Sequence, residues 1–208
     1  MKNNYFKTFV SGILAGASIA IGGTVFLALD NKVLGAVFFC AGLFTVCTFG
    51  FSLFTGKVCY VFENEKSYAI GLIPMWLGNL VGSLIIGGLV LISRLGPALS
   101  AKAAGICETK LGDSYVSIFA LAILCDIMIF IAVDGYKNNP HEIGKYLSII
   151  FGITVFIICG FEHCVANMYY ITVAKAWGGK AIAFLIVNTI GNAAGGVLVP
   201  LVRSKLLK

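Results

Sequence analysis

The sequence predicts an all-α membrane protein with six transmembrane helices. Hydrophobic residues make up 59% of the 208-residue chain, charged residues only 12%, and the mean hydropathy is +0.97. A soluble domain of this length needs more polar residues on its surface than this composition supplies. We therefore expect a lipid bilayer around a single transmembrane domain, 1–208.

Six apolar segments follow one another, and each has the roughly 20 residues that a spanning helix needs. They are 6–29, 33–62, 68–95, 114–133, 145–174 and 181–202. Six spans place both termini on one side of the membrane. A slight excess of Lys and Arg on that side favours the cytoplasm for both termini.

The polar connector 97–113 divides the spans into repeat one, 6–96, and repeat two, 114–202. Three spans in each repeat mean that the second repeat enters the membrane inverted. The second and fifth spans are too long for one helix and contain polar, turn-forming stretches at 51–57 and 160–167. Paired broken helices in inverted repeats are typical of a binding or permeation site near the membrane midplane.

A Gly-Asn motif follows each of these broken helices and allows close helix packing. These structural residues are Gly78, Asn79, Gly82, Gly191, Asn192 and Gly195. Together the features predict two helix–broken helix–helix units.

The polar residues within the spans are the candidates for function, because burying them in lipid is costly. His163 is the only histidine in a span, and Glu162 precedes it. We expect Thr55, in the other break, to face His163. Asp126 lies in the fourth span and needs either a partner or a neutral form. Large apolar residues near the breaks are candidates for hydrophobic constrictions, which exclude hydrated ions.

The segment 160–169, GFEHCVANMY, closely resembles the fifth-span motif of the formate–nitrite transporter family, and 53–56, LFTG, resembles its second-span loop. The resemblance implies an aquaporin-like fold, assembled as a homopentamer with one pore per protomer in the bacterial inner membrane. It also implies passage of small monovalent anions or their acids, namely formate, nitrite and hydrosulfide. His163 is then the central pore histidine, opposite Thr55, and Lys110 enriches anions at the entrance. Glu162, Asn167 and Asp126 complete the predicted pore residues.

The resemblance also implies two constrictions, one formed by Leu43 and Phe156 and the other by Phe39 and Leu53. Two features differ from the family pattern. Asp126 occupies a position where the family usually has Asn, and Lys110 is its candidate partner. The chain also starts close to its first span, so we expect the family's amphipathic N-terminal helix to be shortened or absent.

Two alternatives remain open from the sequence. A neutral-solute channel for water or glycerol has the same broken-helix architecture, although neither break contains Pro. A membrane-embedded enzyme needs a fuller set of catalytic groups than Glu162, His163 and Asp126. The seven cysteines have no metal-binding or redox spacing, so we expect no metal and no cofactor. The scattered basic residues indicate no nucleic-acid partner.

Overall fold

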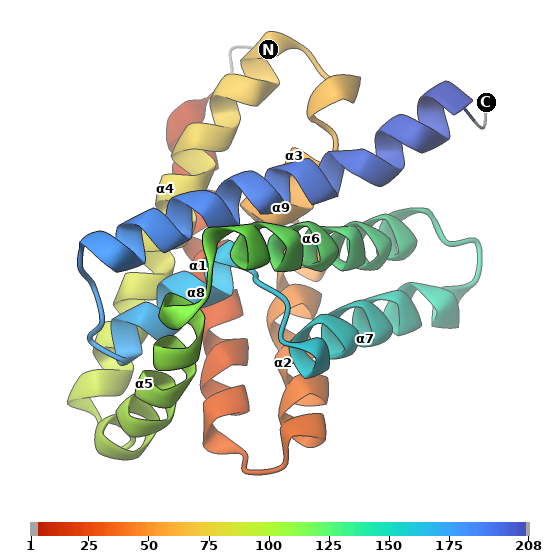
Figure 1. Cartoon of the computed structure of the whole chain (residues 1–208). Helices are drawn as coiled ribbons and strands as arrows, with labels where there is room; N and C mark the ends of the chain where they lie inside the picture. Colours follow the sequence, from red (N-terminus) through yellow and green to blue (C-terminus); the bar gives the residue numbers. More distant parts are fainter. Residues whose placement is uncertain (1–3, 207–208) are drawn as a thin grey trace.

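The computed structural model describes residues 4–206, and that part of the chain is helical, with short connections (Figure 1). In chain order the elements are α1 (Tyr5–Ala28), α2 (Lys32–Phe49), α3 (Phe54–Val58), the 3-10 helix η1 (Val61–Glu63), α4 (Lys66–Ile92), α5 (Gly96–Gly112), α6 (Tyr115–Asn138), α7 (Glu142–Cys159), α8 (Cys164–Val173) and α9 (Gly179–Leu206). The predicted connector 97–113 is thus largely the helix α5.

Six of the described helices, α1, α2, α4, α6, α7 and α9, are long and apolar enough to cross a membrane, with a mean hydropathy of 1.8 to 2.8 in their most apolar windows. Large apolar side chains such as Phe6, Ile92, Val116 and Phe151 are exposed on them. Exposure of such side chains is unfavourable in water but favourable in the hydrocarbon core of a bilayer. The prediction of a six-span helical membrane protein is confirmed.

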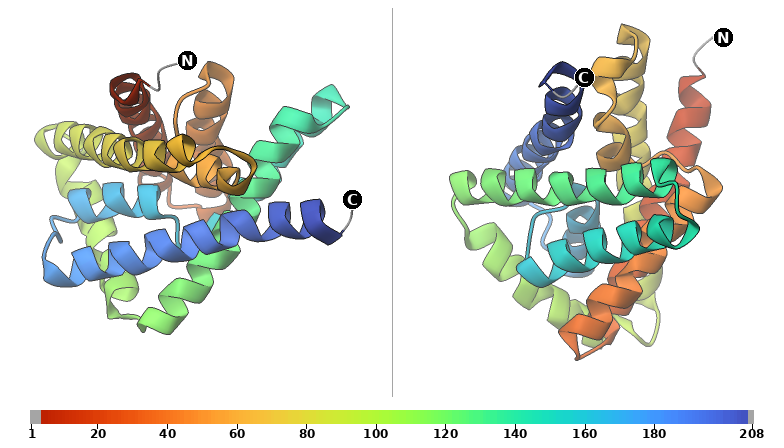
Figure 2. Two further views of the ribbon diagram at one scale, coloured as in Figure 1. Left: turned by 90° about the horizontal axis from the view of Figure 1, so that it is seen from above. Right: turned by 90° about the vertical axis from the view of Figure 1, so that its right-hand side faces the viewer.

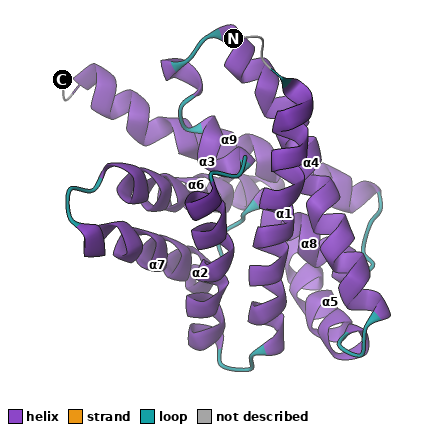
Figure 3. Ribbon diagram, turned by 180° about the vertical axis from the view of Figure 1, so that it is seen from behind, coloured by secondary structure: helices purple, strands orange, loops and turns teal. Residues whose placement is uncertain are grey.

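The spanning helices form two groups that pack against each other. In the first group α1 contacts α4 and α2, and in the second α6 contacts α9 and α7. Contacts between α2 and α7 and between α4 and α8 join the groups, and the short α8 lies inside the bundle (Figures 1 and 3). Both ends of the described chain lie towards the top of Figure 1, whereas α5 and the α1–α2 turn lie at the bottom. In the right-hand view of Figure 2, α5 again lies at the end of the bundle opposite to the start of α1 and the end of α9.

Close helix crossings depend on two glycines of the Gly-Asn motifs. A Cβ atom at Gly82 of α4 would lie 2.7 Å from the backbone nitrogen of Ala17 in α1. A Cβ atom at Gly195 of α9 would lie 2.7 Å from Cα of Ile123 in α6. Only glycine permits such backbone approach, which is how small residues promote helix packing in membranes.

The helices α2 and α7 end in nearly the same way. Gly50 follows α2 with φ 68° and ψ 27°, and Gly160 follows α7 with φ 72° and ψ 26°. This left-handed conformation is accessible to glycine without steric cost and commonly terminates helices. After short non-helical segments the chain becomes helical again at Phe54 and at Cys164, and these two segments build the site.

Candidate functional site

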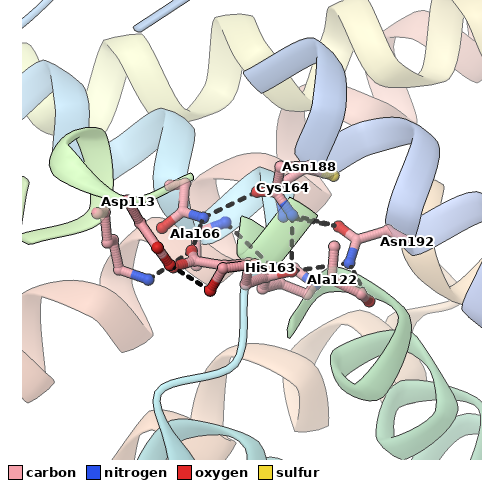
Figure 4. A network of polar contacts seen from close by, with 11 residues as sticks. Asp113, Ala122, His163, Cys164, Ala166, Asn188 and Asn192 are labelled. Atoms are coloured by element: carbon pink, nitrogen blue, oxygen red, sulfur yellow. Dashed lines mark hydrogen bonds and ion pairs between the residues drawn. The ribbon is translucent and has the colours of Figure 1, made fainter. Parts of the chain in front are cut away.

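Asn192 of α9 fixes the segment that precedes α8. Its Oδ1 accepts the backbone N–H of Cys164 at 2.8 Å, while its Nδ2 donates to the carbonyl oxygens of Glu162 at 2.8 Å and Ala122 at 2.9 Å. Asn192 is fully buried, so these bonds satisfy backbone groups that no water reaches. Figure 4 shows this amide, with Asn188, beside the segment around His163 and Cys164.

Asn79 of α4 does the same for the segment that precedes α3. Its Oδ1 accepts the backbone N–H of Phe54 at 2.9 Å, and its Nδ2 donates to the carbonyl oxygens of Ser52 and Gly12, both at 2.9 Å. Each asparagine therefore binds the first residue of the following short helix, the residue two positions before it, and a carbonyl on a neighbouring helix.

His163 lies at the N-cap of α8, and both ring nitrogens have partners. Nδ1 accepts the backbone N–H of Ala166 at 3.0 Å, and Nε2 lies 2.9 Å from Oγ1 of Thr55. Because Nδ1 is an acceptor, the network assigns the ring proton to Nε2, which then donates to Thr55. The imidazole is therefore held as a neutral ring with its N–H directed at α3. Both side chains are almost completely buried.

Glu162, which precedes His163, bonds with Lys110. Its Oε2 accepts from Nζ of Lys110 at 2.5 Å and from Nδ2 of Asn167 at 2.7 Å. The side chain of Glu162 is 4% exposed and that of Lys110 is 17% exposed, so the ion pair is well shielded from water. Asn167 also donates to Asn188, whose Nδ2 in turn binds the carbonyl oxygen of Glu162.

Two cavities approach this centre from opposite sides. The larger, of about 530 Å³, is lined by Lys110, Glu162, His163, Asn167 and Phe156 among others, and we call it the Lys110 vestibule. The smaller has a volume of about 170 Å³, and we call it the Lys57 vestibule. Its lining residues are Leu43, Val46, Cys47, Gly50, Phe51, Leu53, Gly56, Lys57, Val133, Tyr136 and Lys137.

Four buried apolar side chains lie between the vestibules or at their inner walls. Leu43 and Leu53 both line the Lys57 vestibule, whereas Phe156 lines the Lys110 vestibule. The ring of Phe156 stacks on His163 with centroids 5.6 Å apart and meets Phe39 edge-on at 6.1 Å. The apolar residues and the Thr55–His163 pair thus occupy the same short stretch between the two cavities.

Asp126 is placed differently from the other candidates. It is fully buried, lines neither vestibule, and has no hydrogen-bond partner on either carboxyl oxygen within the described residues. It lies against Gly196, where an added Cβ would come 2.6 Å from Oδ2 and 3.0 Å from Sγ of Cys59. Lys110, its candidate partner in the sequence, is bonded to Glu162 instead.

Sequence reasoning missed Asn188 and the contribution of Lys32. Asn188 is fully buried one helical turn before Asn192, and this polar spacing within an apolar span was an available signal. Lys32 lines the Lys110 vestibule and donates to the carbonyl oxygen of Ile158 at 3.0 Å. This position of Lys32 depends on the packing of α2 against α7, which no local sequence pattern predicts.

A six-span protein in which two cavities meet at a buried polar pair and apolar side chains belongs to the class of channels and transporters. Residues 1–204 match the formate/nitrite transporter family, and the chain belongs to it. It is 31% identical to the uncharacterized transporter YrhG of Bacillus subtilis (strain 168), over 91% of this chain and 80% of that protein. It is 30% identical to a probable formate transporter of Methanothermobacter thermautotrophicus, over 92% of this chain and 85% of that protein.

The fold is also similar to that of a solved pentameric formate channel with formate bound. The TM-score is 0.82 and the sequence identity 25%, with 100% of this chain and 98% of that chain covered. These relatives are transporters and channels, so the chain is a transport protein and the enzyme alternative is set aside.

Proposed function

We propose that the chain forms a transmembrane pore for small monovalent anions or their conjugate acids, with formate and nitrite as the first substrates to test and hydrosulfide as a third. The observation that carries the proposal is the contact between Thr55 Oγ1 and His163 Nε2 at a buried position between two cavities with basic residues. The formate/nitrite transporter family and the likeness to a formate channel agree with it.

The apolar residues and the hydrogen-bonding residues of the pore act on the solute in different ways. A bare anion loses several kcal/mol or more of hydration on entering an apolar constriction, while a neutral acid loses far less. Phe39, Leu43, Leu53 and Phe156 therefore favour a neutral or neutralised solute. Thr55 and His163 supply hydrogen bonds where the anion sheds water.

The proton has to come from elsewhere than the neutral histidine. Its Nε2 proton cannot leave without forming an imidazolate, and its Nδ1 is occupied by the backbone N–H of Ala166. In our mechanism the anion takes its proton from a hydronium ion at the inner end of a vestibule, which leaves neutral water behind. It then crosses as the acid, hydrogen-bonded by Thr55 and His163.

The finer architecture is part of this proposal. The two asparagine clamps, with matching left-handed glycines, support two inverted repeats with broken second and fifth helices, as in aquaporin-like folds. We further propose one pore per protomer of a homopentamer in the bacterial inner membrane, with both termini in the cytoplasm. In that arrangement Asn79 and Asn192 hold the breaks, and Gly78, Gly82, Gly191 and Gly195 allow the close crossings.

Flux through purified protein in liposomes tests the proposal. Wild-type protein should carry formate and nitrite, with lactate and water flux measured in parallel. His163→Ala and His163→Asn should lower the rates of formate and nitrite flux, because each removes the ring nitrogen that bonds to Thr55. His163→Ala also removes the N-cap of α8, which costs about 1 kcal/mol of stability. His163→Asn keeps an acceptor for the N-terminus of α8, so a loss of flux in this variant reflects the pore and not the missing cap. Fast water flux without anion flux would favour the neutral-solute channel, and unchanged rates in both variants would remove His163 from the mechanism.

A further inference from the structure

The charged residues that line the two vestibules are not balanced in the same way. The Lys110 vestibule is lined by two cations and two anions, Lys32, Lys110, Asp113 and Glu162. The Lys57 vestibule is lined by Lys57 and Lys137 and by no acidic residue within the described part of the chain. The net charge of the lining residues is therefore close to zero in the Lys110 vestibule and positive in the Lys57 vestibule.

The pairing of each lysine strengthens this difference. Lys110 is neutralised by the buried carboxylate of Glu162 at 2.5 Å. Lys57 forms no ion pair with any described carboxylate, and a second cavity that it lines, beside Tyr5 and Met75, contains no acid either. Its side chain is only partly exposed.

Lys137 is the weaker of the two charges. Its Nζ lies 5.0 Å from the centre of the Tyr60 ring, and it also lines a neighbouring cavity that contains Glu63 and Asp134. Asp134 is paired with Arg203 at 3.1 Å, so Glu63 is the acid left to offset Lys137. Lys57 remains the main source of uncompensated positive potential.

We propose that Lys57, assisted by Lys137, forms the anion-collecting site of the pore, at which a small monovalent anion is held before it reaches Leu43 and Leu53. This deepens the function proposed above and rests on it. A partly buried cation without a counterion attracts anions more strongly than an exposed one, because little water screens it. The cavity of about 170 Å³ has room for a small anion and a few waters, at roughly 30 Å³ per water. Lys57 therefore supplies the unpaired positive charge of its vestibule, whereas Lys110 in the other vestibule is ion-paired.

Cys47 allows the local potential to be measured without any transport. It lines the same cavity and is partly exposed. In a Cys159→Ser background, which removes the exposed cysteine, Cys47 is modified with a negatively and a positively charged methanethiosulfonate of similar size. The ratio of the two rates cancels the intrinsic reactivity of the thiol. Cys47→Ser must abolish the labelling.

The expected result is a ratio that favours the anionic reagent and falls about tenfold in Lys57→Gln, while Lys57→Arg keeps it. Lys66→Gln is the matched control. Lys66 is exposed at the start of α4, close to Lys57 because Tyr68 Oη donates to the Lys57 carbonyl oxygen at 2.8 Å, yet it lines neither vestibule. An unchanged ratio in Lys57→Gln overturns the proposal.

Formate flux on the same proteins separates this inference from the proposed function. Lys57→Gln should raise the formate concentration for half-maximal flux about tenfold and change the maximal rate much less. A labelling ratio that shifts as expected in a protein that carries no formate or nitrite would refute the proposed function alone. Flux that does not respond to Lys57, together with an unshifted ratio, would refute the anion-collecting site alone.

Discussion

The amide of Asn192 makes three hydrogen bonds that match those of Asn79: each amide bonds twice to the chain at the start of a short helix, α8 or α3, and once to a carbonyl of a neighbouring helix. In both places a side chain replaces the backbone partners that a continuous helix would provide. Such satisfaction is obligatory inside a membrane, where each unpaired backbone group costs several kcal/mol. The two asparagines therefore determine where Thr55 and His163 lie.

Replacing either asparagine should destabilise the protein. Asn192→Ala leaves one N–H and two carbonyl groups without that partner, and we expect a loss of about 2 kcal/mol or more in unfolding free energy. Asn192→Asp keeps the acceptor but loses both donors, so it should not rescue stability. Thermal unfolding in detergent measures the effect. Asn64→Ala, which removes one exposed bond to Tyr60, is the control and should change little.

Thr55→Val tests the hydroxyl at the centre of the pore. Val has nearly the shape of Thr but leaves the Nε2–H of His163 without its acceptor, at a cost of about 1–3 kcal/mol. We expect formate flux to fall at least about tenfold, which corresponds to 1.4 kcal/mol, and Thr55→Ser to retain most of it. Equal flux in the Val and Ser variants would show that the hydroxyl has no role in permeation.

The amount of structure that the sequence predicts differs between the spans and the site. Hydropathy was sufficient to place six membrane-crossing segments, because lipid requires long apolar runs wherever a helix crosses. The polar residues within the second and fifth segments coincide with the ends of α2 and α7. These are local properties, and local properties are visible in a sequence.

Contacts between segments that are distant in the sequence could not be predicted from such local properties. The Glu162–Lys110 ion pair depends on how α5 packs against α8, and the isolation of Asp126 depends on α6 meeting Gly196 of α9. The family resemblance gave Lys110 the role of enriching anions but carried no information about its counterion. The different charge of the two vestibules emerges only when all lining residues are known.

Glu162→Gln should release the charge of Lys110. The substitution removes the carboxylate but keeps an oxygen that can accept from Asn167, so the local fold has support. The lining charge of the Lys110 vestibule then becomes positive, and the formate concentration for half-maximal flux should fall by roughly threefold or more. Concentration series of formate influx at low ionic strength measure this, and the gain should shrink in high salt.

The converse change, Lys110→Met, should be harmful. It leaves the carboxylate of Glu162 buried with only Asn167 as a side-chain partner, and breaking a buried pair in this way costs about 3–5 kcal/mol. The double variant Lys110→Met/Glu162→Gln should recover much of the lost stability. Thermal unfolding of all three variants completes a double-mutant cycle, and additive losses would show that the two side chains do not interact.

Phe156→Ala should weaken the apolar barrier. The ring is buried against His163 and Phe39, and its removal opens space next to the Lys110 vestibule. We expect the flux of lactate and chloride to rise above the wild-type value, together with a loss of about 3 kcal/mol or more in stability. Phe151→Ala is the control, because this residue of the same helix is 62% exposed and lines no vestibule. Lactate flux that stays at its wild-type value would place the barrier elsewhere.

Asp126→Asn should stabilise the protein or leave its stability unchanged, unlike most substitutions of fully buried residues. Neither oxygen of Asp126 has a hydrogen-bond partner within the described residues, so the carboxyl offers no contact that Asn would break. Asn carries an amide in place of the acid and can never carry the charge of an unpaired buried carboxylate, whose desolvation is more costly than that of a neutral group. Asn also has almost the same size, which matters because Gly196 leaves no room for a larger side chain.

Asp30→Asn provides the comparison for this effect. Lys102, at 2.7 Å, lowers the pKa of the exposed Asp30 carboxyl. Any stabilisation from that pair is present at neutral pH and is lost in acid, as the pH falls through the lowered pKa. Exposed pairs contribute little, so Asp30→Asn should shift the unfolding temperature hardly at all, and only downwards. If Asp126→Asn instead lowers the unfolding temperature far more than Asp30→Asn does, the Asp126 carboxyl makes a stabilising contact that the amide cannot make, and the prediction is refuted.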